Sequence, residues 1–194
     1  MHSLATALEA ELVPLPPLDA PASFEAWRAE AATAPERTRV VVSVWNDEPG
    51  PESLVDLDEN HWARRFEHPY LLWHFALGAA TRRCAGGGAI ATLVQTPAAL
   101  DSPGWTPETS IADGVVALTR SLAASEGARG VRVNTVTTPL GLVGRPVIAP
   151  APPLDCFPGR LEDEVAGAIR LLLSPDAAGL TGRVLCADGG RSLA

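Results

Sequence analysis

The stretch ETSIADGVVALTRSLAASEGARGVRVNTV, residues 108–136, decides the fold of this chain. Its first part carries apolar residues at helical spacing and predicts a helix over about 109–127. Its last part, VRVNTV at 131–136, is short, apolar and β-branched, which predicts a buried strand. A helix that leads directly into such a strand is typical of a parallel sheet, whose strands are joined by helical crossovers.

The same alternation of helices and strands continues on both sides of this stretch. Short apolar runs predict strands at residues 12–15, 39–45, 86–94, 131–136 and 182–190. Longer amphipathic segments predict helices at residues 1–11, 24–34, 59–83, 109–127 and 161–173. Asp58 is a candidate N-cap for the third helix, and Pro69 is expected to kink that helix or to mark its true start. The pattern predicts an α/β fold in one domain, residues 1–194, with a parallel sheet and right-handed crossovers.

The charge of the chain argues against broad binding of nucleic acid. The net charge is −8 and the pI is about 4.9, whereas binding to phosphates requires clustered positive charge. The pairs Arg64-Arg65 and Arg82-Arg83 are too short for a basic stripe, and we expect them to be solvated helix positions. All 15 basic residues are arginine, so the sequence contains no lysine.

Cysteine usage and the apolar runs bear on the compartment. Cys84, Cys156 and Cys186 are widely spaced and odd in number, which predicts neither a disulfide framework nor a zinc site. The N-terminal residues have no basic region followed by a long apolar core, so we expect no signal peptide. No apolar run approaches the roughly 20 residues of a membrane span. We expect a cytoplasmic protein that does not bind membranes.

Two motifs resemble the short-chain dehydrogenase/reductase (SDR) family. VALTRSLAASEGARGVRVNTVTTP, residues 116–139, is similar to the family's long helix and the strand after it. DEVAGAIRLLLSPDAAGLTGRVLCADGG, residues 163–190, is similar to its last helix, the turn that follows and its closing strand. RVVVSVWN at 39–46 falls where the family has the strand that usually ends in NNAG, and residues 10–27 resemble its third strand with the next helix.

The resemblance implies a Rossmann-like, doubly wound parallel sheet. Aligned in this way, the sequence starts at the family's second helix, so we expect an N-terminally truncated member that lacks the first β-α-β unit. That unit carries the glycine-rich turn that receives the pyrophosphate of a dinucleotide. The cluster Gly86-Gly87-Gly88 precedes a strand and predicts a helix stop instead. We therefore expect that NAD(P) binding is lost and that the chain holds neither cofactor nor metal.

The resemblance also implies four active-site positions. The place of the family's tyrosine falls on Glu108, and the place of its lysine falls on Ala112. The place of its serine falls on Gln95, and that of its asparagine falls near His68. No lysine exists to fill the gap, and the single tyrosine, Tyr70, lies on an earlier helix. We therefore expect a catalytically degenerate member without the standard hydride-transfer chemistry.

These observations favour a pseudoenzyme, a non-catalytic scaffold or regulatory subunit. Family members usually assemble as dimers or tetramers, so the resemblance implies an oligomer with itself or with an active, full-length reductase. The segments that correspond to the family's interfaces are the helices 59–83, 109–127 and 161–173 and the strand 182–190. The stripe of Val115, Leu118 and Leu122 would serve core and interface alike.

Other functions stay open from the sequence. The chain could be an enzyme with altered, non-redox acid–base chemistry in the remnant cleft, through Glu108 or His68, or an atypical SDR oxidoreductase. It could also bind a small ligand in an apolar pocket between Trp45, Trp105 and the loop 137–159.

Overall fold

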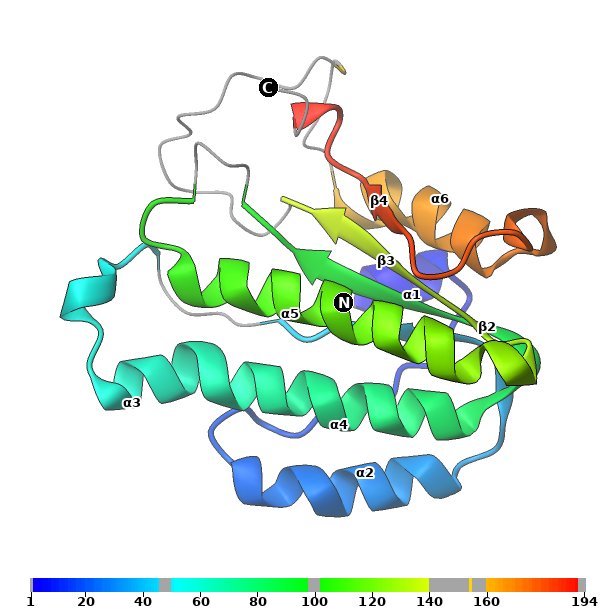
Figure 1. Ribbon diagram of the computed structural model, residues 1–194, viewed down its shortest axis with the longest axis horizontal. Helices are drawn as coiled ribbons and strands as arrows, with labels where there is room; N and C mark the ends of the chain where they lie inside the picture. The colour runs from blue at the N-terminus through cyan, green and yellow to red at the C-terminus, as the bar shows by residue number, and fades with distance from the viewer. Residues whose placement is uncertain (1, 46–49, 98–101, 140–153, 155–159, 192–194) are drawn as a thin grey trace.

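The chain folds around a parallel β-sheet. The computed structural model describes residues 2–45, 50–97, 102–139, 154 and 160–191. The sheet has four strands in the order β1-β2-β3-β4, all parallel to their neighbours (Figure 1). The strands are β1 (Arg37–Val42), β2 (Cys84–Gln95), β3 (Arg132–Thr138) and β4 (Val184–Cys186). Among the described residues, β1 and β4 form the two edges of the sheet.

Helices cover both faces of this sheet. The helices are α1 (His2–Ala7), α2 (Phe24–Thr33), α3 (Glu59–Trp62), α4 (His68–Arg83), α5 (Thr106–Glu126) and α6 (Leu161–Leu173). Helices α4 and α5 pack on one face, α1 and α6 pack on the other, and α2 lies against the outer side of α4 (Figure 1). The expected α/β, doubly wound architecture is therefore confirmed.

Strand β2 is buried on both faces, as its continuous apolar run predicts. Ile90 and Val94 belong to the core cluster beneath α4 and α5. Ala91 and Leu93 point the other way, into the cluster beneath α1 and α6. The two hydrophobic cores of the molecule therefore meet across this strand.

Three buried hydroxyl groups join β2, β3 and α5. Thr92 donates to Thr135 at 2.8 Å, and Thr135 donates to Thr119 of α5 at 3.0 Å. All three side chains are buried, so each hydroxyl needs a partner inside the core. The small network supplies these partners and keeps α5 in place over the sheet.

The letters RVN in the β3 motif have a structural explanation. Asn134 donates to the carbonyl of Leu180 at 2.8 Å and accepts from the amide of Arg183 at 3.0 Å, which holds the chain as it enters β4. The guanidinium of Arg132 donates to three carbonyls at the end of α6 and just beyond it, those of Leu172 (2.7 Å), Ser174 (2.9 Å) and Ala177 (3.0 Å). A cation at this place complements the negative end of the helix and satisfies carbonyls that have no partner within the helix.

Three predicted elements near the ends of the chain were wrong in extent or type. The first helix ends at Ala7 instead of residue 11, and Glu9 takes a left-handed conformation just after it. Residues 12–15 form no strand, because Pro14 lacks the amide that a sheet requires; its carbonyl accepts from the indole of Trp27 at 3.0 Å. The last strand covers only Val184–Cys186 of the predicted 182–190.

The helix predicted at 59–83 is interrupted. Asp58 caps α3 as expected, since its carboxylate accepts from the amide of His61 at 2.8 Å. A π-helical turn, Ala63–Glu67, then precedes α4. Pro69 lies in the first turn of α4, directly after the π-helical turn, where the hydrogen-bond pattern of the helix changes.

The glycine cluster at 86–88 does not stop a helix, because α4 already ends at Arg83 and the glycines lie inside β2. They form a bulge against β1, where the pairing skips from Arg37 with Cys84 to Arg39 with Ala89. A Cβ atom on Gly88 would lie 2.8 Å from the carbonyl oxygen of Thr38. The cluster therefore allows two strands to approach each other closely.

Several other expectations can be placed on the structure. Cys84 and Cys186 are free thiols, and burial raises the pKa of Cys84; Cys156 lies outside the described residues. Most of the loop 137–159 also lies outside them. No helix in the described part of the chain combines the length and the apolar character that a membrane crossing requires.

Candidate functional site

The four positions that the SDR resemblance implies lie on β2, α4 and α5. Gln95 ends β2, beside Thr138 at the end of β3. Glu108 lies in the first turn of α5 and Ala112 follows one turn later, while His68 begins α4. In open α/β sheets, ligands bind beyond the carboxyl ends of the strands, so these elements surround the usual place for a site.

Glu108 makes a bidentate ion pair at this place. The Nη2 atom of Arg65 lies 2.8 Å and 2.9 Å from its two carboxylate oxygens, and Nε lies 3.0 Å from Oε1. The side chain of Arg65 is only 4% exposed and that of Glu108 only 15%. Two parallel charge-assisted hydrogen bonds of this kind fix the orientation of the carboxylate as well as its charge.

Arg65 lies in the π-helical turn Ala63–Glu67 and is buried. The expectation that both residues of the pair Arg64-Arg65 are solvated was therefore wrong for Arg65. π-helical turns shift the side chains of a helix out of their regular register and recur at functional sites. Arg65 also lies 3.4 Å from a carboxylate oxygen of Glu52 and 5.7 Å from the ring centre of Trp105. No sequence pattern indicates this network, because Arg65 and Glu108 are 43 residues apart.

Ala112, at the position implied for the family's lysine, and Tyr70, the chain's single tyrosine, both take part in helix packing. Ala112 is buried in the core cluster beneath α4 and α5. Tyr70 lies on α4 and contacts α5 at Gly114, where an added Cβ would lie 2.5 Å from a ring carbon of the tyrosine. Its ring also stacks on Phe66 with a centroid separation of 5.5 Å. Tyr70 therefore packs two helices together.

The histidines do not assemble into a metal site in the described part of the chain, where no group of three potential ligands is found. His61 lies 3.6 Å from Glu52 and 3.8 Å from Asp58. The Nδ1 atom of His68 is buried without a hydrogen-bond partner in the described structure. The geometry thus gives Glu108 the guanidinium of Arg65 as a partner.

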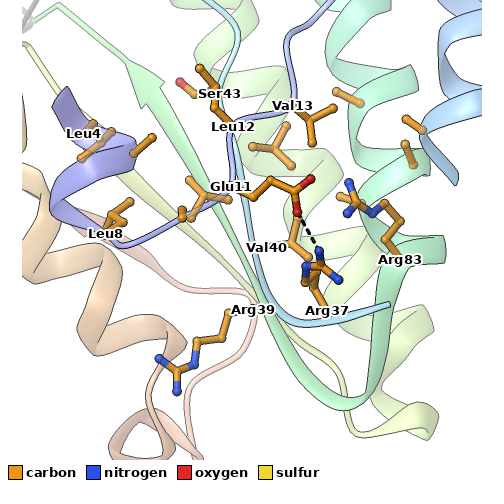
Figure 2. Close-up of a pocket in the computed structure, with 18 of the residues that line it drawn as sticks. Leu4, Leu8, Glu11, Leu12, Val13, Arg37, Arg39, Val40, Ser43 and Arg83 are labelled. Atoms are coloured by element: carbon orange, nitrogen blue, oxygen red, sulfur yellow. Dashed lines mark hydrogen bonds and ion pairs between the residues drawn. The ribbon is translucent and has the colours of Figure 1, made fainter. Parts of the chain in front are cut away.

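The pocket shown in Figure 2 lies elsewhere, along β1, and its lining includes none of the four positions. The glycine cluster is also remote from the carboxyl ends of the strands, because it lies at the beginning of β2. The described residues therefore do not fit the pyrophosphate of a dinucleotide in the usual Rossmann manner. Trp105 is buried beside Arg65, and the loop predicted to form an apolar pocket with it lies mostly outside the described residues.

Comparison with known proteins agrees with this architecture. The chain is 28% identical over 171 residues to 4-formylbenzenesulfonate dehydrogenase TsaC1/TsaC2 of Comamonas testosteroni. It is 36% identical over 103 residues to (2S)-[(R)-hydroxy(phenyl)methyl]succinyl-CoA dehydrogenase subunit BbsD of Thauera aromatica. The crystal structure of a 3-ketoacyl-ACP reductase from Sinorhizobium meliloti superposes with a TM-score of 0.68 at 25% identity. The chain thus resembles the SDR family in sequence and in fold.

The matches differ in how much of each SDR protein they cover. They include 81% of this chain and 63% of the Comamonas dehydrogenase, and 48% of this chain and 41% of the Thauera subunit. The superposition with the Sinorhizobium reductase covers 97% of this chain and 82% of that one. The chain thus spans less than two thirds of both curated relatives. No family model matches it.

Proposed function

We propose that this SDR chain is a pseudoenzyme, a non-catalytic scaffold or regulatory subunit that assembles with itself or with an active short-chain reductase. The observation that carries the proposal is the ion pair between Arg65 and Glu108. Motif spacing assigns Glu108 to the position from which the family's tyrosine gives and takes a proton. A carboxylate held by three charge-assisted hydrogen bonds is a poor replacement for that phenol.

The lysine position supports the same conclusion. In the family, a lysine lowers the pKa of the tyrosine and holds the ribose of the cofactor. Here Ala112 is part of the hydrophobic core, and the 194-residue sequence has no lysine at all. Arginine does not replace lysine simply, because its pKa is too high and its planar head has a different shape.

The surface beside α6 and the last strand, β4, supports the role of a subunit. Leu171 of α6, Leu180 of the following turn and Val184 of β4 are 46%, 40% and 37% exposed. β4 is also a free edge within the described sheet. Apolar side chains beside an unpaired strand are typical of surfaces that other chains cover. One relative, BbsD, is itself named as a subunit of a dehydrogenase.

Titration calorimetry with NADH and NADPH, together with an activity assay, tests whether cofactor binding and reductase activity are lost. We expect no heat of binding and no carbonyl-dependent oxidation of either nucleotide by the purified chain. A complete SDR reductase in the same buffer is the positive control. Micromolar binding of a nucleotide, or turnover of any ketone or aldehyde, would contradict the proposal.

Sedimentation velocity tests the assembly. We expect the chain to sediment as an oligomer, alone or after mixing with an active reductase from its source, and Val184→Glu to weaken that oligomer. Val55→Glu is the matched control, because Val55 is 89% exposed and lies away from α6 and β4. A chain that stays monomeric in both settings is not a scaffold of this kind.

A further inference from the structure

The first strand of the sheet has the sequence of an interior strand but the position of an edge strand. The run RVVVSVW at 39–45 is β-branched and apolar, as in parallel strands that are buried on both faces. In the structure, however, Val40 and Val41 are only half-buried, whereas their β2 partners Ile90 and Ala91 are fully buried. The missing burial lies on the open side of β1.

The backbone of β1 is also incomplete on that side. β2 is its single strand neighbour among the described residues. The N-terminal segment passes nearby, yet no backbone hydrogen bond joins the described parts of residues 8–15 and 37–43. An edge strand presents a row of free amides and carbonyls, which is a template for pairing with a further strand.

A pocket of about 390 Å³ lies between this edge and the N-terminal segment. Leu8, Leu12 and Val13 line it from the N-terminal segment, facing Val40 and Ser43 of the β1 region (Figure 2). Its floor is apolar, with alanines of α4 (Ala76, Ala79 and Ala80) contributing. The edge of β1 therefore opens into a space that apolar side chains can fill.

The rim of the pocket is basic, although the whole chain carries a net charge of −8. It holds four arginines and two glutamates, namely Arg37, Arg39, Arg83, Arg170, Glu9 and Glu11. Figure 2 shows Arg37 and Arg39 in the lower half of the view and Arg83 to their right. The side chain of Arg39 is exposed and makes no hydrogen bond or ion pair within the described part of the chain.

We propose that this edge receives an extended strand of a different polypeptide, apolar in its middle and acidic at its ends, which pairs with β1 as a further strand of the sheet. Main-chain hydrogen bonds to the free edge would supply affinity, and the pocket would select the alternate side chains. The acidic ends would complement the arginines of the rim. A second copy of this chain is a poorer occupant, because its β1 would bring the same arginines against this rim.

One ion pair crosses the pocket and has to open. Arg37 and Glu11 lie 2.6 Å apart and join the two walls at one end (Figure 2). Both side chains are more than two-fifths exposed, at 44% and 62%. Exposed pairs of this kind contribute little to stability, so an incoming strand displaces this one easily.

A set of blocked, fluorescein-labelled octapeptides tests the proposal. We expect EVTVTVTE to bind to the purified full chain in fluorescence anisotropy and to slow hydrogen exchange at the amides of residues 37–43. KVTVTVTK should bind at least about fivefold more weakly, the factor that loss of an exposed charge pair produces. EVTPTVTE should not bind, because proline prevents pairing of the strand.

Two charge reversals of the protein complete the test. Arg39→Glu should abolish the preference for the acidic peptide over the lysine peptide, without a change in circular dichroism. Arg82→Glu, at an exposed neighbour that does not line the pocket, should leave the preference unchanged.

Three results would overturn the proposal. The first is binding of the acidic peptide without protection of the β1 amides, and the second is no binding of any of the peptides. The third is protection of these amides in the free protein, growing with protein concentration, which would identify a second copy as the occupant.

Discussion

At the scale of single residues, the buried Arg65 fixes the surroundings of Glu108. Its charge is buried almost completely, which is tolerated only when the charge is paired and hydrogen-bonded. Its partner is Glu108, which motif spacing assigns to the position of the family's tyrosine. The same residue contacts Glu52 and Trp105, and thereby ties the loop at residues 50–53 to the start of α5.

The pair makes a prediction about stability. Arg65→Met should lower the free energy of unfolding by about 3 kcal/mol, because it leaves the mostly buried Glu108 without its counter-charge. The double variant Arg65→Met with Glu108→Gln should lose less than the sum of the two single variants, by about 1–3 kcal/mol. Urea unfolding curves measure these values.

Arg82, an exposed arginine of α4, supplies the control for this cycle. Arg82→Met should change the free energy of unfolding by about 0.5 kcal/mol or less. Additive effects of Arg65→Met and Glu108→Gln would show that the two side chains do not support each other.

At the scale of secondary structure, the contact between α4 and α5 depends on a glycine. Gly114 leaves room for the ring of Tyr70, which lies where a Cβ atom would be. Glycine in the middle of a helix costs up to about 1 kcal/mol relative to alanine, so α5 gives up intrinsic stability to bring the helices together.

Gly114→Ala should therefore destabilise the protein, by about 1 kcal/mol, because overpacking against Tyr70 outweighs the gain in helix propensity. The same change in a Tyr70→Ala background should be neutral or stabilising. Thermal unfolding of the four proteins gives the comparison.

Gly167→Ala is the control for this prediction, since Gly167 lies in α6 with no atom within 4 Å of an added Cβ. It should stabilise the protein by up to about 1 kcal/mol. Stabilisation by Gly114→Ala in the presence of Tyr70 would contradict the packing that we describe.

Elements with long, regular hydrophobic patterns could be predicted from the sequence, whereas features that depend on contacts between remote residues could not. Strands β2 and β3 and helices α5 and α6 have patterns long enough to identify from the sequence, and the structure confirms each of them within a few residues. The segment 12–15 was mistaken for a strand because its apolar residues conceal the effect of Pro14. The π-helical turn was not predictable, since it is stabilised by contacts of Arg65 with residues remote in sequence. The four family positions stay predictions from motif spacing, and no sequence pattern indicated that Arg65 pairs with Glu108.

At the scale of the whole molecule, several exposed carboxylates favour the folded state only while they are ionised. A hydrogen bond from Arg37 lowers the pKa of Glu11 from its ordinary 4.5. Hydrogen bonds from the amide of His61 and from the side chain of Arg160 lower the pKa values of Asp58 and Asp163 from 3.8. The unfolded chain therefore binds protons at a higher pH than the folded chain does.

The stabilisation by these groups should be fully present above about pH 5, where the carboxylates are ionised even in the unfolded chain. It should be lost as the pH falls below 4.5 for Glu11 and below 3.8 for the two aspartates, through their lowered pKa values. Urea unfolding from pH 7 to pH 3 measures this decline. High salt should weaken it, because the groups are exposed.

Glu11→Gln should make the decline in acid shallower, since it removes one of the groups that take up protons on unfolding. Glu30→Gln, at an exposed glutamate on α2, is the matched control and should leave the curve unchanged. Identical acid curves for wild type and Glu11→Gln would show that the contact with Arg37 does not form in solution.

The parallel pairing of the strands has a consequence for how the chain reaches its native state. Ser43 reaches Leu93 across 50 residues of sequence, and Thr92 reaches Thr135 across 43, so neighbouring strands meet only after long stretches of chain have been made. Contacts between residues so remote in sequence slow the search for the native topology, and folds dominated by them take milliseconds to seconds to form. During synthesis on the ribosome, β1 and β2 must therefore wait with their apolar surfaces uncovered until β3 has emerged.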